Sequence, residues 1–255
     1  MPLLALTRAV SPAMSRCELT HLAREPIDLA RARDQHAAYA RALADLGCTV
    51  REVEPSPDLP DSVFIEDAAL VLDEIAIVTR PGASSRRPEV EGVHAALAPF
   101  RHVTRIGDPG TMDGGDLLRT GRTIFVGRSS RTNDEGIRQL ASIVAPYAYD
   151  VRGVDVSGCL HLKSAATAVD DGLLLANRSW ISARSLAPFE IVDVDPSEPG
   201  AANLVSVGGR LLAAAAFPRT RDRLERRGFE VRTVEMSEFA KAEGAVTCCS
   251  LIFET

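Results

Sequence analysis

A hairpin pattern that recurs four times along the chain constrains the fold more than any other feature of the sequence. Each copy has a short apolar strand, a tight turn, a second apolar strand, and a loop that opens a helical segment. The four hairpins span residues 69–80, 116–128, 165–177 and 203–216. The expected helical segments span residues 86–98, 133–145 and 219–227, with a weaker one after the third hairpin.

The two ends of the chain supply a fifth copy of the pattern. Leu3–Arg8 resembles Ile75–Arg80, the second strand of the first hairpin, but no first strand precedes it. Cys249–Phe253 can provide the missing strand. We therefore predict an α/β fold of five ββαβ-type modules around a pseudo-fivefold axis, with the last module closed by the two termini. Closure of this kind removes exposed sheet edges, as in propellers.

An open α/β sheet with coincidental hairpins is the alternative fold. Hairpins that alternate with helices argue against a doubly wound parallel sheet, and no glycine-rich phosphate loop follows a strand, so we expect no nucleotide cofactor. Residues 28–46 are predicted to form a scaffold helix that ends before Gly47. Its expected inward positions are Leu29, Ala32, Ala37, Ala40, Leu43 and Leu46.

Composition narrows the class of protein. The chain has 255 residues, 45% of them hydrophobic, and no linker rich in Pro, Gly or Ser divides it, so we expect a single domain over residues 1–255. A net charge of -6 argues against a nucleic-acid partner. Five cysteines without metal-ligand spacing favour reduced thiols in a cytoplasmic protein. No apolar run is long enough to predict a membrane span.

Four polar clusters lie at the ends of apolar strand patterns, and they span residues 61–67, 112–116, 161–164 and 243–250. The first contains Asp61, Glu66 and Asp67, whose carboxylates could bind a guanidinium or ammonium group through charge-assisted hydrogen bonds. A loop of solvated acids is the alternative interpretation of this cluster.

The other clusters gain meaning from their combination. Taken alone, Asp113-Gly-Gly-Asp116 is typical of a turn, and a single histidine such as His161 is more often structural. Alternation along a strand would send the side chains of Cys248 and Cys249 to opposite faces, so that one of them faces an axial cavity. A Cys, a His and an Asp together can provide a thiolate, its general acid/base and an orienting carboxylate.

Several segments resemble the signature segments of the dimethylarginine dimethylaminohydrolase family, in the same order and at similar spacing. These segments are 61–67, 79–87, 113–116, 131–133, 161–164 and 247–250. The resemblance implies the pentein fold, also called the α/β propeller, whose axis forms the active-site channel. It also implies hydrolysis of Nω-methylated arginine to citrulline and a methylamine, without a metal or cofactor.

Residue-by-residue matching to this family implies a catalytic group. Cys248 would be the nucleophile, His161 the general acid/base, and Asp113 the carboxylate that orients His161. Other members of the family have Glu where Asp113 stands. The same matching makes Asp67 the residue that holds the guanidinium, with Glu66 nearby.

The resemblance also implies which residues bind the amino-acid end of the substrate. Asp61 would bind the α-ammonium group together with the backbone carbonyls of Leu19 and Ala242. Arg86 and Arg131 would clamp the α-carboxylate. The aliphatic stem would pack against a further matched residue, Phe64.

Two features depart from the family pattern, because Glu243 stands where Asp is expected and Cys159 where the family usually differs. The polar stretch Ser11–Thr20 is compatible with a flap near the channel. An arginine deiminase-like enzyme is the closest alternative function, although such enzymes carry an inserted helical domain for which this chain has no room. A non-catalytic pentein that binds a protein or a cationic metabolite is the second alternative. The chain could form a homodimer.

Overall fold

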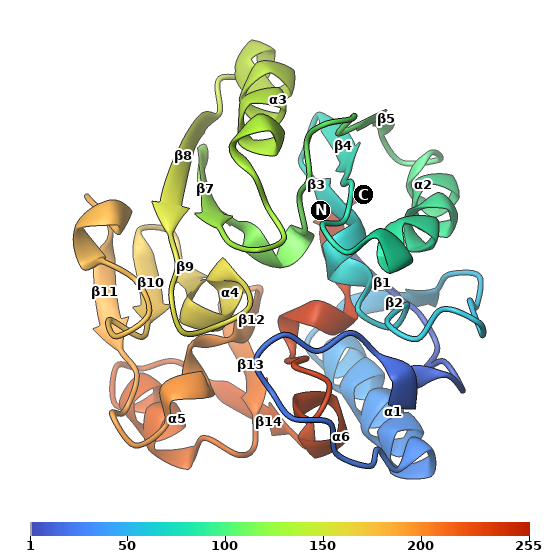
Figure 1. Ribbon diagram of the computed structural model, residues 1–255. Helices are drawn as coiled ribbons and strands as arrows, with labels where there is room; N and C mark the ends of the chain where they lie inside the picture. Colours follow the sequence, from blue (N-terminus) through green and yellow to red (C-terminus); the bar gives the residue numbers. More distant parts are fainter. Residues whose placement is uncertain (1) are drawn as a thin grey trace.

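The computed structural model describes residues 2–255, which form five three-stranded sheets arranged in a ring (Figure 1). All five sheets are built alike. The first strand pairs antiparallel with the second, and the second pairs parallel with a third that follows a crossover segment. The predicted α/β fold of five ββαβ modules is confirmed, and the open-sheet alternative is wrong.

Four of the sheets come from consecutive stretches of chain. The first has β3 (Ala69–Val71), β4 (Ile75–Val78) and β5 (His102–Arg105), and the second has β6 (Leu117–Thr120), β7 (Thr123–Arg128) and β8 (Asp150–Asp155). The third has β9 (Ala166–Asp170), β10 (Leu173–Ala176) and β11 (Glu190–Asp193), and the fourth has β12 (Leu204–Val207), β13 (Arg210–Ala214) and β14 (Val231–Val234).

The fifth sheet joins the two ends of the chain. It has β15 (Leu251–Glu254), β1 (Leu3–Thr7) and β2 (Cys48–Glu52) in that order. Leu4 of β1 lies opposite Phe253 of β15 in the antiparallel register. The expected partner for the N-terminal strand is therefore the observed one.

Crossover helices cover the outside of the ring (Figure 1). They are α1 (Leu29–Asp45), η3 (Ser84–Glu89) with α2 (Val90–Leu97), α3 (Asp134–Val144) with η5 (Ala145–Tyr147), η6 (Ala183–Leu186) and α5 (Pro218–Glu225). The third module has only the single 3-10 turn η6 at this place, in agreement with its weak helical pattern. Two further short helices are η1 (Met14–Arg16) and α6 (Ser237–Ala240).

The inward face of α1 differs in part from the predicted one. Ala37 is exposed, whereas Gln35, His36 and Tyr39 are buried. Polar tips are tolerated there because two of them have partners: Gln35 Nε2 donates to Ser237 Oγ at 2.8 Å, and the Tyr39 hydroxyl lies 2.6 Å from Ser250 Oγ. Apolar periodicity alone could not include these positions.

A helical turn precedes the first strand of every module. These turns are η2 (Ile65–Ala68), η4 (Gly114–Asp116), α4 (Leu162–Ala165), η7 (Pro199–Ala202) and η8 (Thr247–Cys249). Contacts join η2 to both η4 and η8, and α4 to both η4 and η7. The turns therefore meet around the centre of the ring. Four of them carry residues of the polar clusters noted in the sequence, so these clusters lie at the centre.

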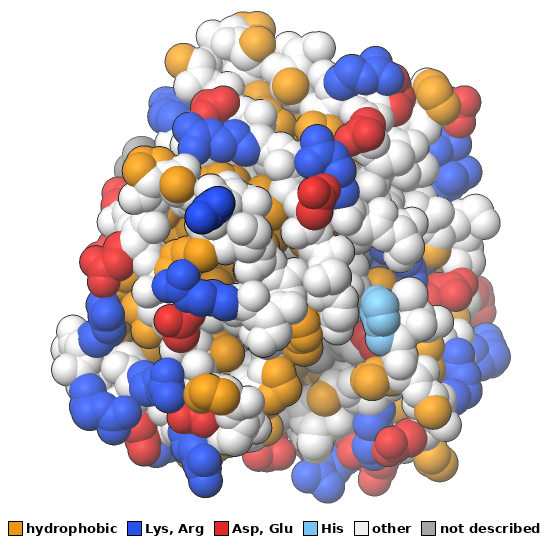
Figure 2. All heavy atoms as spheres, turned by 60° about the vertical axis from the view of Figure 1, so that its left-hand side comes forward, with side chains coloured by type: hydrophobic (Ala, Val, Ile, Leu, Met, Phe, Trp, Pro, Cys, Tyr) orange, Lys and Arg blue, Asp and Glu red, His pale blue; other side chains and the backbone are white. Residues whose placement is uncertain are grey.

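The outer surface is mixed in charge. On the face drawn in Figure 2, basic and acidic side chains are interspersed. Elsewhere on the surface, Arg105 and Glu91 form an ion pair with an Nη1–Oε1 distance of 2.6 Å. Among residues 2–255, none of the helices has the length and apolar character required to cross a membrane.

Candidate active site

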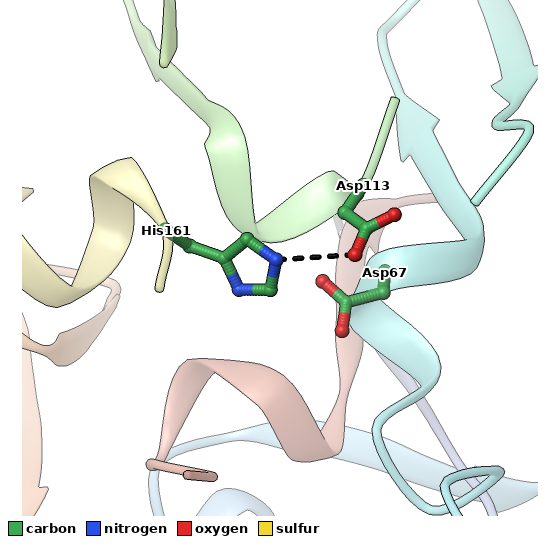
Figure 3. A group of neighbouring side chains, drawn as sticks. All are labelled: Asp67, Asp113 and His161. Carbon is green, nitrogen blue, oxygen red and sulfur yellow. Dashed lines mark hydrogen bonds and ion pairs between the residues drawn. The ribbon is translucent and has the colours of Figure 1, made fainter. Parts of the chain in front are cut away.

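A histidine–aspartate pair lies at the centre of the ring (Figure 3). His161 Nε2 is 3.1 Å from Asp113 Oδ2, and Asp113 is fully buried. Its other oxygen accepts the backbone N–H of Gly82 at 2.9 Å, which fixes the carboxylate. Burial alone would lower the pKa of His161, but Asp67, Asp113 and Asp116 outweigh it and raise this pKa to about 9. The imidazole therefore carries a proton at neutral pH.

Asp67 lies beside this pair (Figure 3). It is held from two sides. Its Oδ1 accepts the Gly115 N–H at 2.8 Å, and its Oδ2 accepts from Arg86 Nη1 at 2.7 Å. Burial would raise the pKa of Asp67, but the charges of His161 and Arg86 lower it below its usual value. Asp67 is thus an ionised carboxylate whose orientation is fixed by Gly115 and Arg86.

The two adjacent cysteines lie in different environments. Cys248 is partly exposed, whereas Cys249 is fully buried. The prediction that one cysteine faces the cavity while the other packs agrees with this difference in burial. The predicted cause, alternation along a strand, is wrong, because both residues lie on the turn η8. Burial, followed by the nearby charges of Glu66 and Asp67, raises the pKa of Cys248 to about 12. Cys248 is a neutral thiol in the free protein.

Cys248 and His161 line one cavity, together with Glu18, Asp61, Phe64, Arg86, Arg131, Leu160, Ala242, Glu243 and Gly244. Seven of these lining residues are among the site residues expected from the resemblance. Glu243 had been noted only as a departure from the family pattern. Glu18, Leu160 and Gly244 were missed, although each of the three is next in sequence to a residue that had been singled out. The free volume is about 20 Å³, which is room for one water molecule.

The arginines expected to bind a carboxylate already have protein partners. Arg86 donates to Asp67 and, through Nη2, to Glu89 Oε2 at 3.0 Å. Burial raises the pKa of Glu89 to about 7 in spite of Arg86. Arg131 Nη2 donates to Thr20 Oγ1 at 3.1 Å, and its Nη1 lies 3.7 Å from an oxygen of Asp113. Both guanidinium groups are thus present at the cavity but engaged.

Asp61 is also engaged, because its two oxygens accept the backbone N–H of Glu18 at 3.2 and 3.1 Å. Burial raises the pKa of Asp61 in spite of Arg86. Leu19 lies next to Glu18, is partly exposed, and packs against the buried cluster that contains Phe64. Its side chain is outside the cavity lining.

Glu66 lies on the turn η2, where it is buried and paired with two side chains. Its Oε1 accepts from Lys163 Nζ at 2.5 Å and its Oε2 from Thr247 Oγ1 at 2.6 Å. Glu66 lines a second cavity of about 410 Å³, which also contacts Lys163 and Thr247. The resemblance implies that Glu66 lies near the guanidinium, and this stays a prediction. Glu66 is not among the residues that line the cavity of Cys248, but its charge is near enough to raise the pKa of the Cys248 thiol.

Asp67, Asp113 and His161 are also the residues that could hold a metal ion. Among residues 2–255 they form a group whose ligand atoms lie within 4.8 Å of one another. Arg86 already neutralises Asp67, and backbone N–H groups occupy one oxygen of each carboxylate. The arrangement suits a histidine with acid partners better than a cation site.

Comparison with known proteins places the chain in a family. No protein-family model matches it. The N(G),N(G)-dimethylarginine dimethylaminohydrolase of Streptomyces coelicolor is 44% identical over 248 residues, which cover 97% of this chain and 95% of the relative. The enzyme of the same name from Pseudomonas aeruginosa is 38% identical over 228 residues, which cover 89% of this chain and 90% of the relative.

Solved structures agree with these relatives. A Cys-to-Ser mutant of the Pseudomonas aeruginosa protein, complexed with citrulline, has a TM-score of 0.93 and 35% identity, with 98% of both chains covered. The N-terminal domain of ArgZ, an arginine dihydrolase from cyanobacteria, has a TM-score of 0.88 over 98% of this chain and 97% of the other. It is 21% identical, so this likeness concerns the fold alone. The chain belongs to the dimethylarginine dimethylaminohydrolase family and has its pentein fold.

Proposed function

We propose that the protein hydrolyses Nω-methylated L-arginine, as asymmetric dimethylarginine or monomethylarginine, to L-citrulline and di- or monomethylamine. One observation carries the proposal: Cys248 and the Asp113-bound His161 line the same cavity, with the oriented carboxylate of Asp67 beside His161. A nucleophile, a proton donor and a guanidinium-binding acid are what such a reaction requires.

The first half of the reaction forms a covalent adduct. The cationic guanidinium pairs with Asp67 and favours ionisation of the Cys248 thiol, which is neutral in the free protein and loses its proton to solvent. The Cys248 sulfur then attacks the guanidinium carbon. His161 gives its proton to the departing dimethylamine or methylamine nitrogen, the C–N bond breaks, and a thiouronium group remains on Cys248.

The second half consumes water. His161, now neutral, takes a proton from a water molecule as its oxygen attacks the adduct carbon. The C–S bond then breaks, the hydroxyl proton passes to the departing sulfur as the C=O bond of L-citrulline forms, and the Cys248 thiol is restored. Asp113 keeps the His161 ring oriented through both proton transfers.

We propose that Asp61 binds the α-ammonium group of the substrate and that Arg131 binds its α-carboxylate. Arg86 would hold Asp67 in place and also contact the α-carboxylate. These residues line the cavity of Cys248, and their present partners, Glu18 and Thr20, come from one loop. Substrate would replace these partners. Agmatine lacks the carboxylate and would leave buried arginine unpaired, so it should be a poor substrate.

The test is citrulline formation by the purified, EDTA-treated protein from asymmetric dimethylarginine, monomethylarginine and arginine, with Cys248→Ser as the matched variant. We expect citrulline from the two methylated substrates and none from Cys248→Ser. Faster turnover of arginine would replace the proposal with a deiminase. Binding without turnover by the unmodified protein would replace it with a binding function.

We further propose that residues 1–255 act as one catalytic domain, which takes a small-molecule substrate and neither nucleic acid nor membrane as its partner. A net charge of -6 supports the exclusion of nucleic acid, and five free cysteines support a cytoplasmic location. The protein would act as a homodimer. Light scattering at enzyme concentrations used for assay would give the mass of a monomer if the dimer is wrong.

A further inference from the structure

Glu243 binds the loop that borders the active-site cavity. Its Oε1 accepts the backbone N–H groups of Thr20 at 3.1 Å, His21 at 2.5 Å and Leu22 at 2.6 Å, and its Oε2 accepts that of Thr20 at 3.0 Å. Three successive N–H groups that converge on one anion make a strong, charge-assisted contact. We call residues 18–22 the rim loop, which lies in the dark blue segment that crosses the front of the ring in Figure 1.

The backbone of Glu243 is held in an uncommon conformation. Its φ is 57°, in the left-handed region that residues other than Gly, Asn and Asp seldom adopt. The next residue, Gly244, approaches Phe64 so closely that an added Cβ would lie 2.3 Å from the ring. The chain therefore turns sharply at the cavity wall, and this turn places the Glu243 carboxylate against the rim loop. Conformational strain of this kind is concentrated at functional sites.

Two other contacts of the rim loop are made with residues that we propose bind the substrate. Asp61 accepts the Glu18 N–H, and Arg131 donates to Thr20 Oγ1. The α-ammonium and α-carboxylate groups of an amino acid would compete for the same two side chains. Glu243 binds no predicted substrate group, so its hold on Thr20, His21 and Leu22 persists when substrate is bound. A further contact, from Ser85 Oγ to the Glu18 carboxylate, holds the start of the loop.

We propose that Glu243 is a positioning residue, which keeps the rim loop over the bound substrate and thereby sets the Leu19 carbonyl against the α-ammonium group. The inference rests on the proposed function. It explains how a cavity with room for one water molecule can admit an amino acid and still exclude solvent, because the loop can release Asp61 and Arg131 while it stays anchored at Glu243.

The test uses Glu243→Gln, which keeps the length of the side chain but removes its charge, and Glu243→Gly, which also relieves the left-handed backbone. Glu25→Gln is the matched control, because Glu25 is an exposed acid in the chain segment just after the rim loop. Amide hydrogen exchange at Thr20, His21 and Leu22 is measured in the free protein. KM and kcat are measured with asymmetric dimethylarginine, and thermal unfolding checks that each variant is folded.

We expect exchange at the three amides to be roughly tenfold faster in both Glu243 variants, since each loses a charge-assisted contact. We expect KM to rise by roughly tenfold with kcat within about threefold of the unmodified protein, because the loss falls on binding. Glu25→Gln should change neither. Unchanged exchange, or faster exchange with unchanged KM, would overturn the proposal. The exchange result requires no turnover, so it tests the anchor even if the proposed reaction is wrong.

Discussion

Replacement of Gly115 by alanine tests the geometry of the active site with a single methyl group. A Cβ at Gly115 would lie 2.6 Å from His161 Nδ1 and 2.9 Å from Asp67 Oδ1. Ordinary contact begins at 3.4 Å, so His161 or the turn that carries Gly115 must shift by about 0.8 Å. Neither can shift freely, because His161 is bonded to Asp113 and the Gly115 N–H is bonded to Asp67.

A displacement of about 1 Å in a catalytic group can cost about a hundredfold in rate. We therefore expect Gly115→Ala to lower kcat/KM for asymmetric dimethylarginine by roughly a hundredfold, with a loss of about 1–3 kcal/mol in the free energy of unfolding from overpacking. Citrulline formation and urea unfolding measure the two effects. Gly107→Ala is the control, because the nearest atom to its added Cβ is 3.9 Å away. If Gly115→Ala retained kcat/KM within about threefold of Gly107→Ala, the close approach of His161 to this turn would be refuted.

Two further predictions concern charge at the centre of the ring. The reactive form needs a proton on His161 (pKa about 9) and none on Cys248 (pKa about 12), so both carry protons at pH 7 and one must be lost. We therefore expect kcat/KM to rise about tenfold per pH unit up to about pH 9 and then level off, and a decline between pH 7 and 9 in initial-rate measurements would contradict this. Lys163→Met would leave the Glu66 carboxylate buried without its cation, so we expect a loss of about 3 kcal/mol in urea unfolding near pH 8. Adding Glu66→Gln to Lys163→Met should recover most of the lost stability. If the double variant recovered none of it, the unpaired Glu66 carboxylate would not be the cause of the loss.

The fold could be predicted because its evidence is local and repeated. Each strand pair is a short apolar run with a turn, and Leu3–Arg8 could be paired with Cys249–Phe253 because only those segments lacked partners. The helical turns at the centre were not predicted. They are too short to show a periodic pattern, and this is why the two adjacent cysteines were wrongly placed on a strand.

Only those residues of the candidate site could be predicted whose side-chain type itself indicates a catalytic role. Cys248, His161 and Asp113 stand out in combination, and the resemblance supplies their order. The partners of Arg86 could not be inferred, because Glu89 and Asp67 reach it through the fold and not through a sequence pattern. The same applies to Glu66, whose partners Lys163 and Thr247 reach it through the fold.

Because the two termini close the ring, Cys248, the proposed nucleophile, enters the fold only at the end of protein synthesis. Cys248 precedes β15, and β15 is the antiparallel partner of β1, which is made first. At about 5–20 residues per second, β1 leaves the ribosome on the order of ten seconds or more before its partner exists. Until then one edge of β1 stays open and available for wrong pairing. A nascent chain therefore gains Cys248 and buries its exposed edge in the same late event, so a prematurely terminated product would lack the proposed nucleophile and be prone to aggregate.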